Sequence, residues 1–285
     1  MKKAGFSELF GLGLRPHHFP EWRSKDQLPL LEVMADNFLF QKGGPGLAHL
    51  QSLREKTDFV LHGVGLNIGS PLPLNQAYLK ALKKLKDRFG PSVVSDHCCF
   101  SSVAGGHSYD LLPLPRNELL LQRLSDKLDH IQNFLGCRFT LENVSSYVEP
   151  KDCTMTEMEF LNELAHRSGC GVLLDLNNIF VSAHNHGFDA RSEIECLSPG
   201  VVTQFHVAGH SEVDDFFLDT HDQTIKDPVW DLLGFAWRRF GPLATILERD
   251  DEAPLDQLLA ERAYGLTKAQ EALLKISERV VENAK

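Results

Sequence analysis

Histidine and acidic side chains stand at the ends of short apolar segments, where such groups are costly to bury. Seven of eight apolar segments carry a histidine, aspartate or glutamate near their carboxyl end. These residues are Glu32, His62, Asp96, His97, Glu142, Asp175, His206 and Glu248. Burying an unpaired charge is strongly unfavourable. Bound cations would remove that cost, because carboxylates neutralise metal ions and imidazoles ligate them through a ring nitrogen.

A second unusual stretch, FFLDTHDQTIKDPVWDL at residues 216–232, places Asp219 and His221 among several other carboxylates. Taken alone, this stretch could be an acidic surface loop. Beside the set at the strand ends, metal binding is the better interpretation. We expect the loop to fold over the same site, with both side chains on one side of an extended segment.

Together these positions give more ligands than one ion needs. The expected set is His62, His97, His206, His221, Asp175, Asp219, Glu142 and Glu248. Such a set suits two or three ions that share a bridging carboxylate. Mixed imidazole and carboxylate ligation favours iron, manganese or zinc over a thiolate zinc site. The six cysteines show no C-x-x-C spacing and are interpreted as reduced thiols.

The elements that would position these ligands alternate along the chain. Eight β-rich runs are separated in several places by amphipathic helical patterns, which favours parallel βαβ units. The runs are residues 9–15, 29–35, 58–64, 92–98, 138–144, 171–177, 201–207 and 243–249. Eight such units predict a (β/α)8 TIM barrel, in which strand ends converge on one mouth. We expect a single domain over residues 1–285, closed by one or two helices after residue 255.

Bulk composition excludes some classes. The formal net charge of -10 disfavours nucleic acid as a partner, because phosphate binding needs clustered Lys and Arg. No apolar run approaches the length of a membrane-spanning helix. The first residues show no apolar signal region or small-residue cleavage site, so we expect no secretion signal. The sequence therefore predicts a cytoplasmic protein that does not act at a membrane.

The motifs, in order, resemble a known family. They are GLGLRPHHF, LEVMADNF, LHGVGLNIGS, VSDHCCFS, DLLPLP, LENVSSY, LLDLNNIFVSAHNHGFD, QFHVAGH, DTHD and ILERD. They resemble the multinuclear non-heme iron-dependent oxidative enzymes, which include methanobactin-biosynthesis-like proteins and were formerly a domain-of-unknown-function family. The layout is also similar to the xylose isomerase and endonuclease IV superfamily of metal-binding TIM barrels.

The resemblance implies a function and its partners. Members hold two or three irons of mixed valence and use dioxygen to oxidise cysteine residues of ribosomally made precursor peptides, in natural product biosynthesis. Zinc or manganese can substitute for iron according to availability. Many members work with a separate protein that binds the precursor's leader. The expected partners are therefore a cysteine-containing precursor peptide and a leader-binding protein, with no nucleic acid.

The resemblance also implies how the ligands divide. His62, His97 and Glu142 would hold one iron. Glu142, Asp175, His206 and Glu248 would surround a second. Asp219 and His221, with Asn178 as a further candidate, would hold a third.

Other residues receive lesser roles. His186, in HNHG, is expected in the pocket without being a required ligand. Arg249 is expected as a partner of the centre or of a substrate carboxylate, because it follows Glu248. Cys98 and Cys99 are interpreted as core packing beside the site.

Three alternatives remain open at this stage. A metal-dependent nuclease of the endonuclease IV type has a similar ligand layout, but the net charge and Asn178, where that family has a histidine, disfavour it. A sugar isomerase lacks a convincing lysine base. A non-catalytic barrel that binds metal or peptide would carry the same ligands.

Overall fold

Eight parallel strands close into one barrel. The computed structural model describes residues 6–103 and 106–283. The barrel strands are β1 (Phe10–Gly13), β2 (Leu31–Met34), β3 (Phe59–Gly63), β4 (Val94–His97), β7 (Thr140–Glu142), β8 (Gly171–Asp175), β9 (Val202–Val207) and β12 (Ala244–Leu247). Their order around the barrel is β1-β12-β9-β8-β7-β4-β3-β2. Each of the eight predicted runs contains one of these strands, so the predicted (β/α)8 barrel is confirmed.

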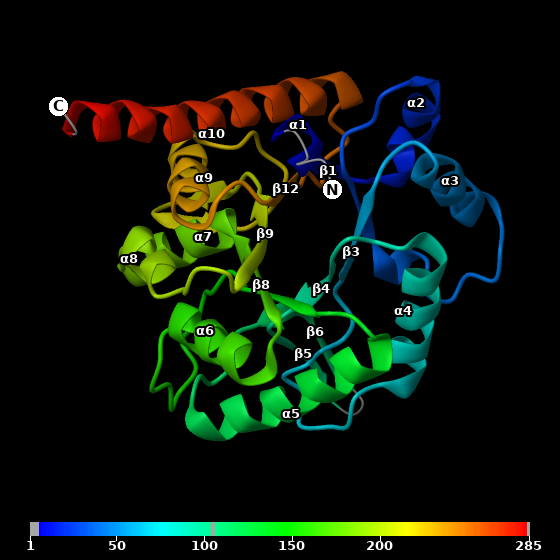
Figure 1. The fold of residues 1–285 in the computed structure, drawn as a ribbon. Coiled ribbons are helices and arrows are strands. Elements are labelled where there is room, and N and C mark those ends of the chain that lie inside the picture. The colour runs from blue at the N-terminus through cyan, green and yellow to red at the C-terminus, as the bar shows by residue number, and fades with distance from the viewer. Residues whose placement is uncertain (1–5, 104–105, 284–285) are drawn as a thin grey trace.

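Helices surround the strands (Figure 1). They are α1 (Phe6–Leu9), α2 (Phe19–Ser24), α3 (Pro45–Arg54), α4 (Gln76–Phe89), α5 (Glu118–Leu135), α6 (Glu157–Ser168), α7 (Leu176–His186), α8 (Ala190–Glu195), α9 (Asp227–Phe240) and α10 (Leu255–Asn283), with short 3-10 turns at Pro16–His18 and Ala35–Asn37. The long helix α10 crosses beside α9 and accounts for the predicted closing helices. Among the described residues, no helix combines the length and apolar character needed to cross a membrane.

Local sequence signals explain several helix boundaries. The Asn75 side chain caps α4 by accepting from the amides of Ala77 and Tyr78. A capping box joins Thr156 and Glu159 at the start of α6. The helix then ends at Gly169, whose φ of 73° suits glycine.

Two antiparallel hairpins were not predicted. One pairs β5 (Phe100–Val103) with β6 (Gly106–Leu112), and the other pairs β10 (Ser211–Val213) with β11 (Phe216–Leu218). The second hairpin follows β9 and leads directly into the Asp219–His221 stretch. That stretch is therefore attached to a small folded unit, and it is not a long unstructured loop.

The barrel interior changes character along its axis. Leu30, Val60 and Ile246 form a small buried apolar cluster apart from the main core. Side chains alternate along a strand, so His62 faces the same side as Val60, and Glu248 faces the same side as Ile246. The interior thus passes from an apolar layer to an ionisable layer at the carboxyl ends.

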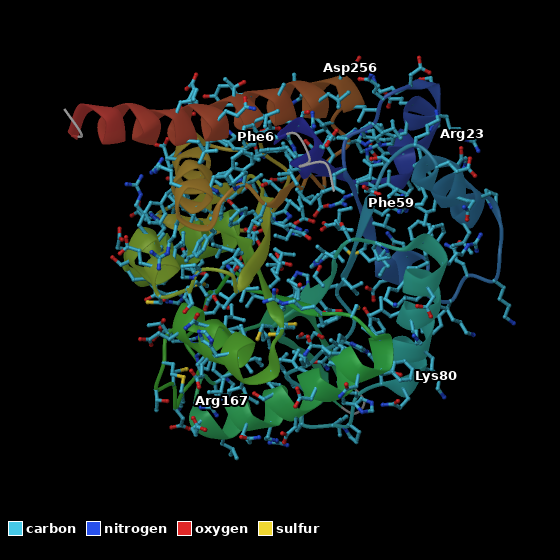
Figure 2. The ribbon with its side chains drawn as sticks, in the orientation of Figure 1. Phe6, Arg23, Phe59, Lys80, Arg167 and Asp256 are labelled. Carbon is cyan, nitrogen blue, oxygen red and sulfur yellow. The ribbon has the colours of Figure 1, made fainter. Side chains whose placement is uncertain are left out.

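The main core lies between the strands and the helices. Phe59 is fully buried there, whereas charged residues of the helices, such as Lys80 and Arg167, point outward (Figure 2). This arrangement keeps the ionisable layer at the barrel mouth apart from the apolar packing that stabilises the fold.

Candidate metal centre

A cavity of about 410 Å³ opens at the carboxyl ends of the strands. Seven of the nine predicted metal ligands line it: His62, His97, Glu142, Asn178, Asp219, His221 and Glu248. The other two, Asp175 and His206, are fully buried. Barrel register places them next to each other, because Asp175 pairs with His206 across β8 and β9. His97 likewise pairs with Glu142 across β4 and β7.

The first group joins two histidines to one carboxylate oxygen. Nε2 of His62 and Nε2 of His97 lie 3.1 and 3.3 Å from Glu142 Oε2. The opposite nitrogen of His97 lies 3.2 Å from the carbonyl oxygen of Gly63, to which it can donate. That hydrogen bond leaves the Nε2 lone pair facing Glu142, which is the form in which histidine ligates a metal. Burial lowers the pKa of both histidines and favours their neutral forms.

The second group has four buried members with ligand atoms within 4.8 Å of one another: Glu142, Asp175, His206 and Glu248. Nδ1 of His206 lies 3.3 Å from Glu142 Oε1 and 3.2 Å from Glu248 Oε2. The two oxygens of Glu142 therefore face different groups. This is the arrangement of a carboxylate that bridges two ions.

Asp175 has one oxygen committed and one free. As the N-cap of α7, its Oδ1 accepts from the amide of Asn178 at 2.7 Å. Its Oδ2 is buried and has no hydrogen-bond partner among the described residues. Burial raises the pKa of Asp175 to about 7, and that of Glu142 also to about 7. Both carboxylates are thus costly to ionise without a cation nearby.

The unpartnered atoms supply a test of whether metal ions fit. Within the described ranges, five buried polar atoms of the predicted ligands lack a hydrogen bond: Glu142 Oε2, Asp175 Oδ2, Asn178 Oδ1, His206 Nδ1 and His221 Nε2. Buried polar groups are normally hydrogen-bonded. All five are oxygen or imidazole nitrogen atoms, the kinds that ligate metal ions. Glu142 Oε2 and His206 Nδ1 each lie 3.1–3.3 Å from atoms of two other group members. The donor set therefore fits metal ions.

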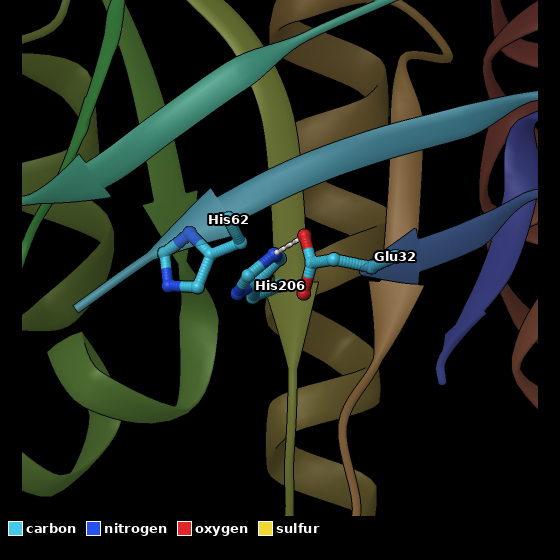
Figure 3. Close-up of side chains that lie close together, drawn as sticks. All are labelled: Glu32, His62 and His206. Carbon is cyan, nitrogen blue, oxygen red and sulfur yellow. Dashed lines mark hydrogen bonds and ion pairs between the residues drawn. The ribbon is translucent and has the colours of Figure 1, made fainter. Parts of the chain in front are cut away.

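Glu32 is a residue whose role sequence reasoning missed. Its Oε2 lies 2.8 Å from His206 Nε2 and accepts from Gln204 Nε2, also at 2.8 Å. Figure 3 shows the His206 ring directed at this carboxylate, with His62 beside it. Glu32, His62 and His206 also form a possible ligand group. The signal was present, because Glu32 stands at a strand end like the others.

The loop pair adopts a different conformation from the one expected. Nε2 of His221 lies 2.8 Å from Asp219 Oδ1, so the two side chains do meet. His221, however, has a φ of 53°, so a left-handed turn brings them together and the segment is not extended there. The amide of His221 donates to the carbonyl of Gly209, and its own carbonyl accepts from the amide of Asp250. A side chain at Gly209 would strike the backbone of Gln223, so glycine lets the loop close.

Arg249 and His186 were expected at the candidate metal cavity, but both lie outside it. Arg249 points away from the cavity, where its guanidinium pairs with Glu261 at 3.0 Å and with Asp251 at 2.9 Å. The expectation overlooked strand alternation, since Glu248 faces inward and the next residue faces outward. His186 lines a separate cavity of about 480 Å³, and its Nε2 lies 2.9 Å from the carbonyl oxygen of Ser146.

Arg15 brings a guanidinium to the candidate metal cavity instead. It lies 2.6 Å from Asp250 and 3.9 Å from Glu248. Its place just after β1, in the motif GLGLRPHHF, was the available signal.

Cys98 and Cys99 are buried, and burial raises the pKa of both thiols, as expected for packing residues.

Comparison with a family model decides the identity. The model described as "RiPP precursor modification enzyme MbnB/TglH/ChrH" matches residues 9–271. The chain belongs to this family. Its relatives include a UPF0276 protein of Anaeromyxobacter, 42% identical over 253 residues, covering 88% of this chain and 89% of that protein. A UPF0276 protein of Caulobacter vibrioides is 43% identical over 255 residues, covering 88% and 91%.

Solved structures share the fold. Endonuclease IV from Thermus thermophilus superposes with a TM-score of 0.55 at 16% identity, covering 93% of this chain and 98% of that one. A xylose isomerase-like TIM barrel protein from Mycobacterium smegmatis, in complex with magnesium, gives 0.56 at 12% identity, covering 90% and 89%. At these identities the likeness shows the architecture alone. The chain thus belongs to a family of RiPP precursor modification enzymes, and its barrel has the same architecture as these solved structures.

Proposed function

We propose that this chain is an iron-dependent oxidative enzyme that modifies cysteine residues of a ribosomally made precursor peptide, using dioxygen and two or three irons of mixed valence. The observation that carries the proposal is the pair of buried ligand groups that share Glu142 at the base of the cavity. Family membership supports the peptide substrate, and the imidazole and carboxylate donors suit iron, with zinc or manganese able to substitute.

The proposed ligands divide into three sets. His62, His97 and Glu142 hold the first ion. Glu142, Asp175, His206 and Glu248 hold the second. Asp219 and His221, with Asn178, hold the ion nearest the loop. The free oxygen of Asn178 supports its inclusion, because it is buried without a hydrogen-bond partner among the described residues. Glu32 orients His206 by accepting from Nε2, which leaves Nδ1 for the metal.

When bound, the irons would supply affinity for the substrate thiolate and electron transfer to dioxygen. The chain positions that chemistry and shields it. The cavity volume suits one side chain of a peptide with its flanking backbone. Met34, Val64 and Val144 contribute apolar wall that limits water around the centre. Arg15 takes the role first assigned to Arg249, because its positive charge lies beside Glu248.

A cavity of this size holds only a small part of the precursor, so the rest of the peptide must bind at other surfaces. The proposal therefore includes a separate leader-binding protein, in line with the family resemblance. It places no nucleic acid in the site, because the charge is -10 and the cavity wall includes Asp110, Asp219 and Asp250.

The test loads the protein anaerobically with iron(II) and then admits air with a synthetic cysteine-containing precursor peptide encoded beside this chain's gene. We expect oxygen uptake together with a mass change at the cysteine, and no change in a peptide with serine there. Glu142→Gln should abolish both readouts. His130→Ala, an exposed histidine on α5, is the matched control and should retain them.

Two results would contradict the proposal. Cleavage of DNA at abasic sites without oxygen would favour the endonuclease IV type of hydrolysis. Stable metal and peptide binding with no oxygen uptake would favour a non-catalytic barrel.

A further inference from the structure

A buried line of polar groups leads from the proposed loop ion into the protein. Asn177 Nδ2 donates to Asp219 Oδ1 at 2.6 Å, and Asn177 Oδ1 lies 2.8 Å from His210 Nδ1. Asn177 is fully buried on the first turn of α7, and His210 is 1% exposed just after β9. Asn177 thus follows Asp175 at the start of α7, and His210 follows His206 after β9. Neither Asn177 nor His210 is a proposed ligand.

The hydrogen bonds in this line can run in one direction only. A carboxylate accepts, so Asn177 must direct its NH2 group at Asp219 and its oxygen at His210. That oxygen can only accept, which requires a proton on His210 Nδ1. The tautomer of His210 is thereby fixed. Its Nε2 is buried without a hydrogen-bond partner within the described ranges, in agreement with a neutral ring that bears its proton on Nδ1.

Aromatic packing holds the His210 ring. Its centroid lies 4.7 Å from that of Phe217, in a stacked arrangement, and 5.3 Å from that of Phe180. Burial lowers the pKa of His210 to about 4, so the ring is neutral at physiological pH. A neutral, clamped imidazole is a fixed donor, and it suits holding an amide in one orientation.

We propose that His210 and Asn177 form a positioning relay that holds the Asp219 carboxylate ready to bind the loop ion. This inference rests on the proposed function, in which Asp219 and His221 ligate that ion. Without the relay, Asp219 keeps its side-chain contacts with His221 and Ser145 but loses the short hydrogen bond from Asn177, so its carboxylate is held less firmly. Partners of this kind typically change metal affinity by about 10- to 100-fold when removed.

The test compares two substitutions of one residue. His210→Phe keeps the aromatic packing and removes the donor. His210→Asn places an amide NH2 near the position of Nδ1 and should restore the bond to Asn177. Each protein is loaded with iron(II) without oxygen, and its iron per chain is measured against increasing chelator. We expect His210→Phe to weaken the most weakly held ion by about 10- to 100-fold and to leave the others unchanged. His210→Asn should recover most of the loss.

Asn177→Leu, which has similar volume and no polar group, should match His210→Phe and carries the test if the phenylalanine variant does not fold. Thermal unfolding of each metal-free variant checks the fold. Parent-like affinity in a folded His210→Phe or Asn177→Leu protein would overturn the relay. His221→Ala separates the two proposals: if it loses no ion, the loop-ion assignment fails as well. If it loses one ion while the relay variants lose none, only the relay fails.

Discussion

The proposed strand-end ligands and the loop pair meet at the same end of the barrel, but they are held in different ways. His62, Glu142 and His206 extend from β3, β7 and β9, which alternate with β4 and β8 around the barrel, so the parallel backbone ladder sets their spacing. Asp219 and His221 depend on a left-handed residue and on hydrogen bonds from other elements. The strand-end residues therefore form a preformed part of the site, whereas Asp219 and His221 form a part that must be assembled by other contacts. We therefore expect the ions of the two parts to differ in occupancy and in sensitivity to substitution.

The largest effect should follow from Glu142→Gln, because this residue contacts both buried groups. The amide keeps the volume but lacks the negative charge and one acceptor. We expect loss of about two ions per chain, measured by elemental analysis of protein loaded with iron(II), and at least a 100-fold loss of peptide oxidation. Full metal content in this variant would contradict a shared carboxylate.

His221→Ala should break the loop part alone. We expect about one ion fewer per chain, with the strand-end ions retained and turnover strongly reduced, because the remaining ligands are held by the barrel. The metal-free melting temperature should stay close to the parent's, since His221 contributes little to the apolar core. Unchanged iron content and unchanged turnover would make His221 a simple surface residue.

Tyr147→Phe should weaken binding of the loop ion by a smaller amount, and it tests whether the loop part responds independently of the strand-end part. The Tyr147 hydroxyl accepts from the backbone amide of Asp219 at 2.9 Å, and its ring packs near Phe216. Phenylalanine keeps that packing and removes the hydrogen bond to Asp219, worth about 1 kcal/mol, together with a longer one from Ser145. We expect the loop ion to bind about fivefold more weakly in a chelator titration, with no change in the strand-end ions. An equal loss from both parts would show that they are not independent.

The smallest effect on metal content is expected for Glu157→Gln, a half-buried carboxylate outside the proposed ligand groups. Burial raises the pKa of Glu157 to about 7, above the usual 4.5. Ionisation is therefore easier in the unfolded chain, so this group favours folding below about pH 4.5 and loses that contribution as pH rises toward 7. Glutamine should stabilise the protein by about 2 kcal/mol at pH 8 relative to pH 5, measured by denaturant unfolding, with unchanged iron. A loss of iron would place Glu157 in the centre.

Much of this arrangement was predictable because barrel geometry converts sequence order into spatial order. Eight apolar runs predicted eight strands, and parallel strands bring their carboxyl ends together, so His62, Glu142 and His206 were expected to meet. Alternation along a strand would also have excluded Arg249, had it been applied to the residue after Glu248. The rule that brings the proposed ligands together was sufficient to correct that assignment.

The remaining features depend on contacts that spacing does not encode. The Asn177–His210 pair joins the start of one helix to the end of the next strand, and neither residue stands at a predicted ligand position. His186 lies on α7, where helix rotation directs it to a different cavity from Asn178. The turn at His221 needs a positive φ, which is uncommon for residues other than glycine and which sequence patterns do not reveal.

The central claim is that Glu142 joins two buried metal sites at the barrel mouth. The most direct measurement is anomalous diffraction at the iron absorption edge, from crystals grown anaerobically after loading with iron(II). The account predicts two strong peaks, one between Glu142 and the pair His62 and His97, and one between Glu142 and the pair His206 and Glu248. A weaker third peak is expected between Asp219 and His221. A single peak, or peaks that do not contact Glu142, would contradict the account.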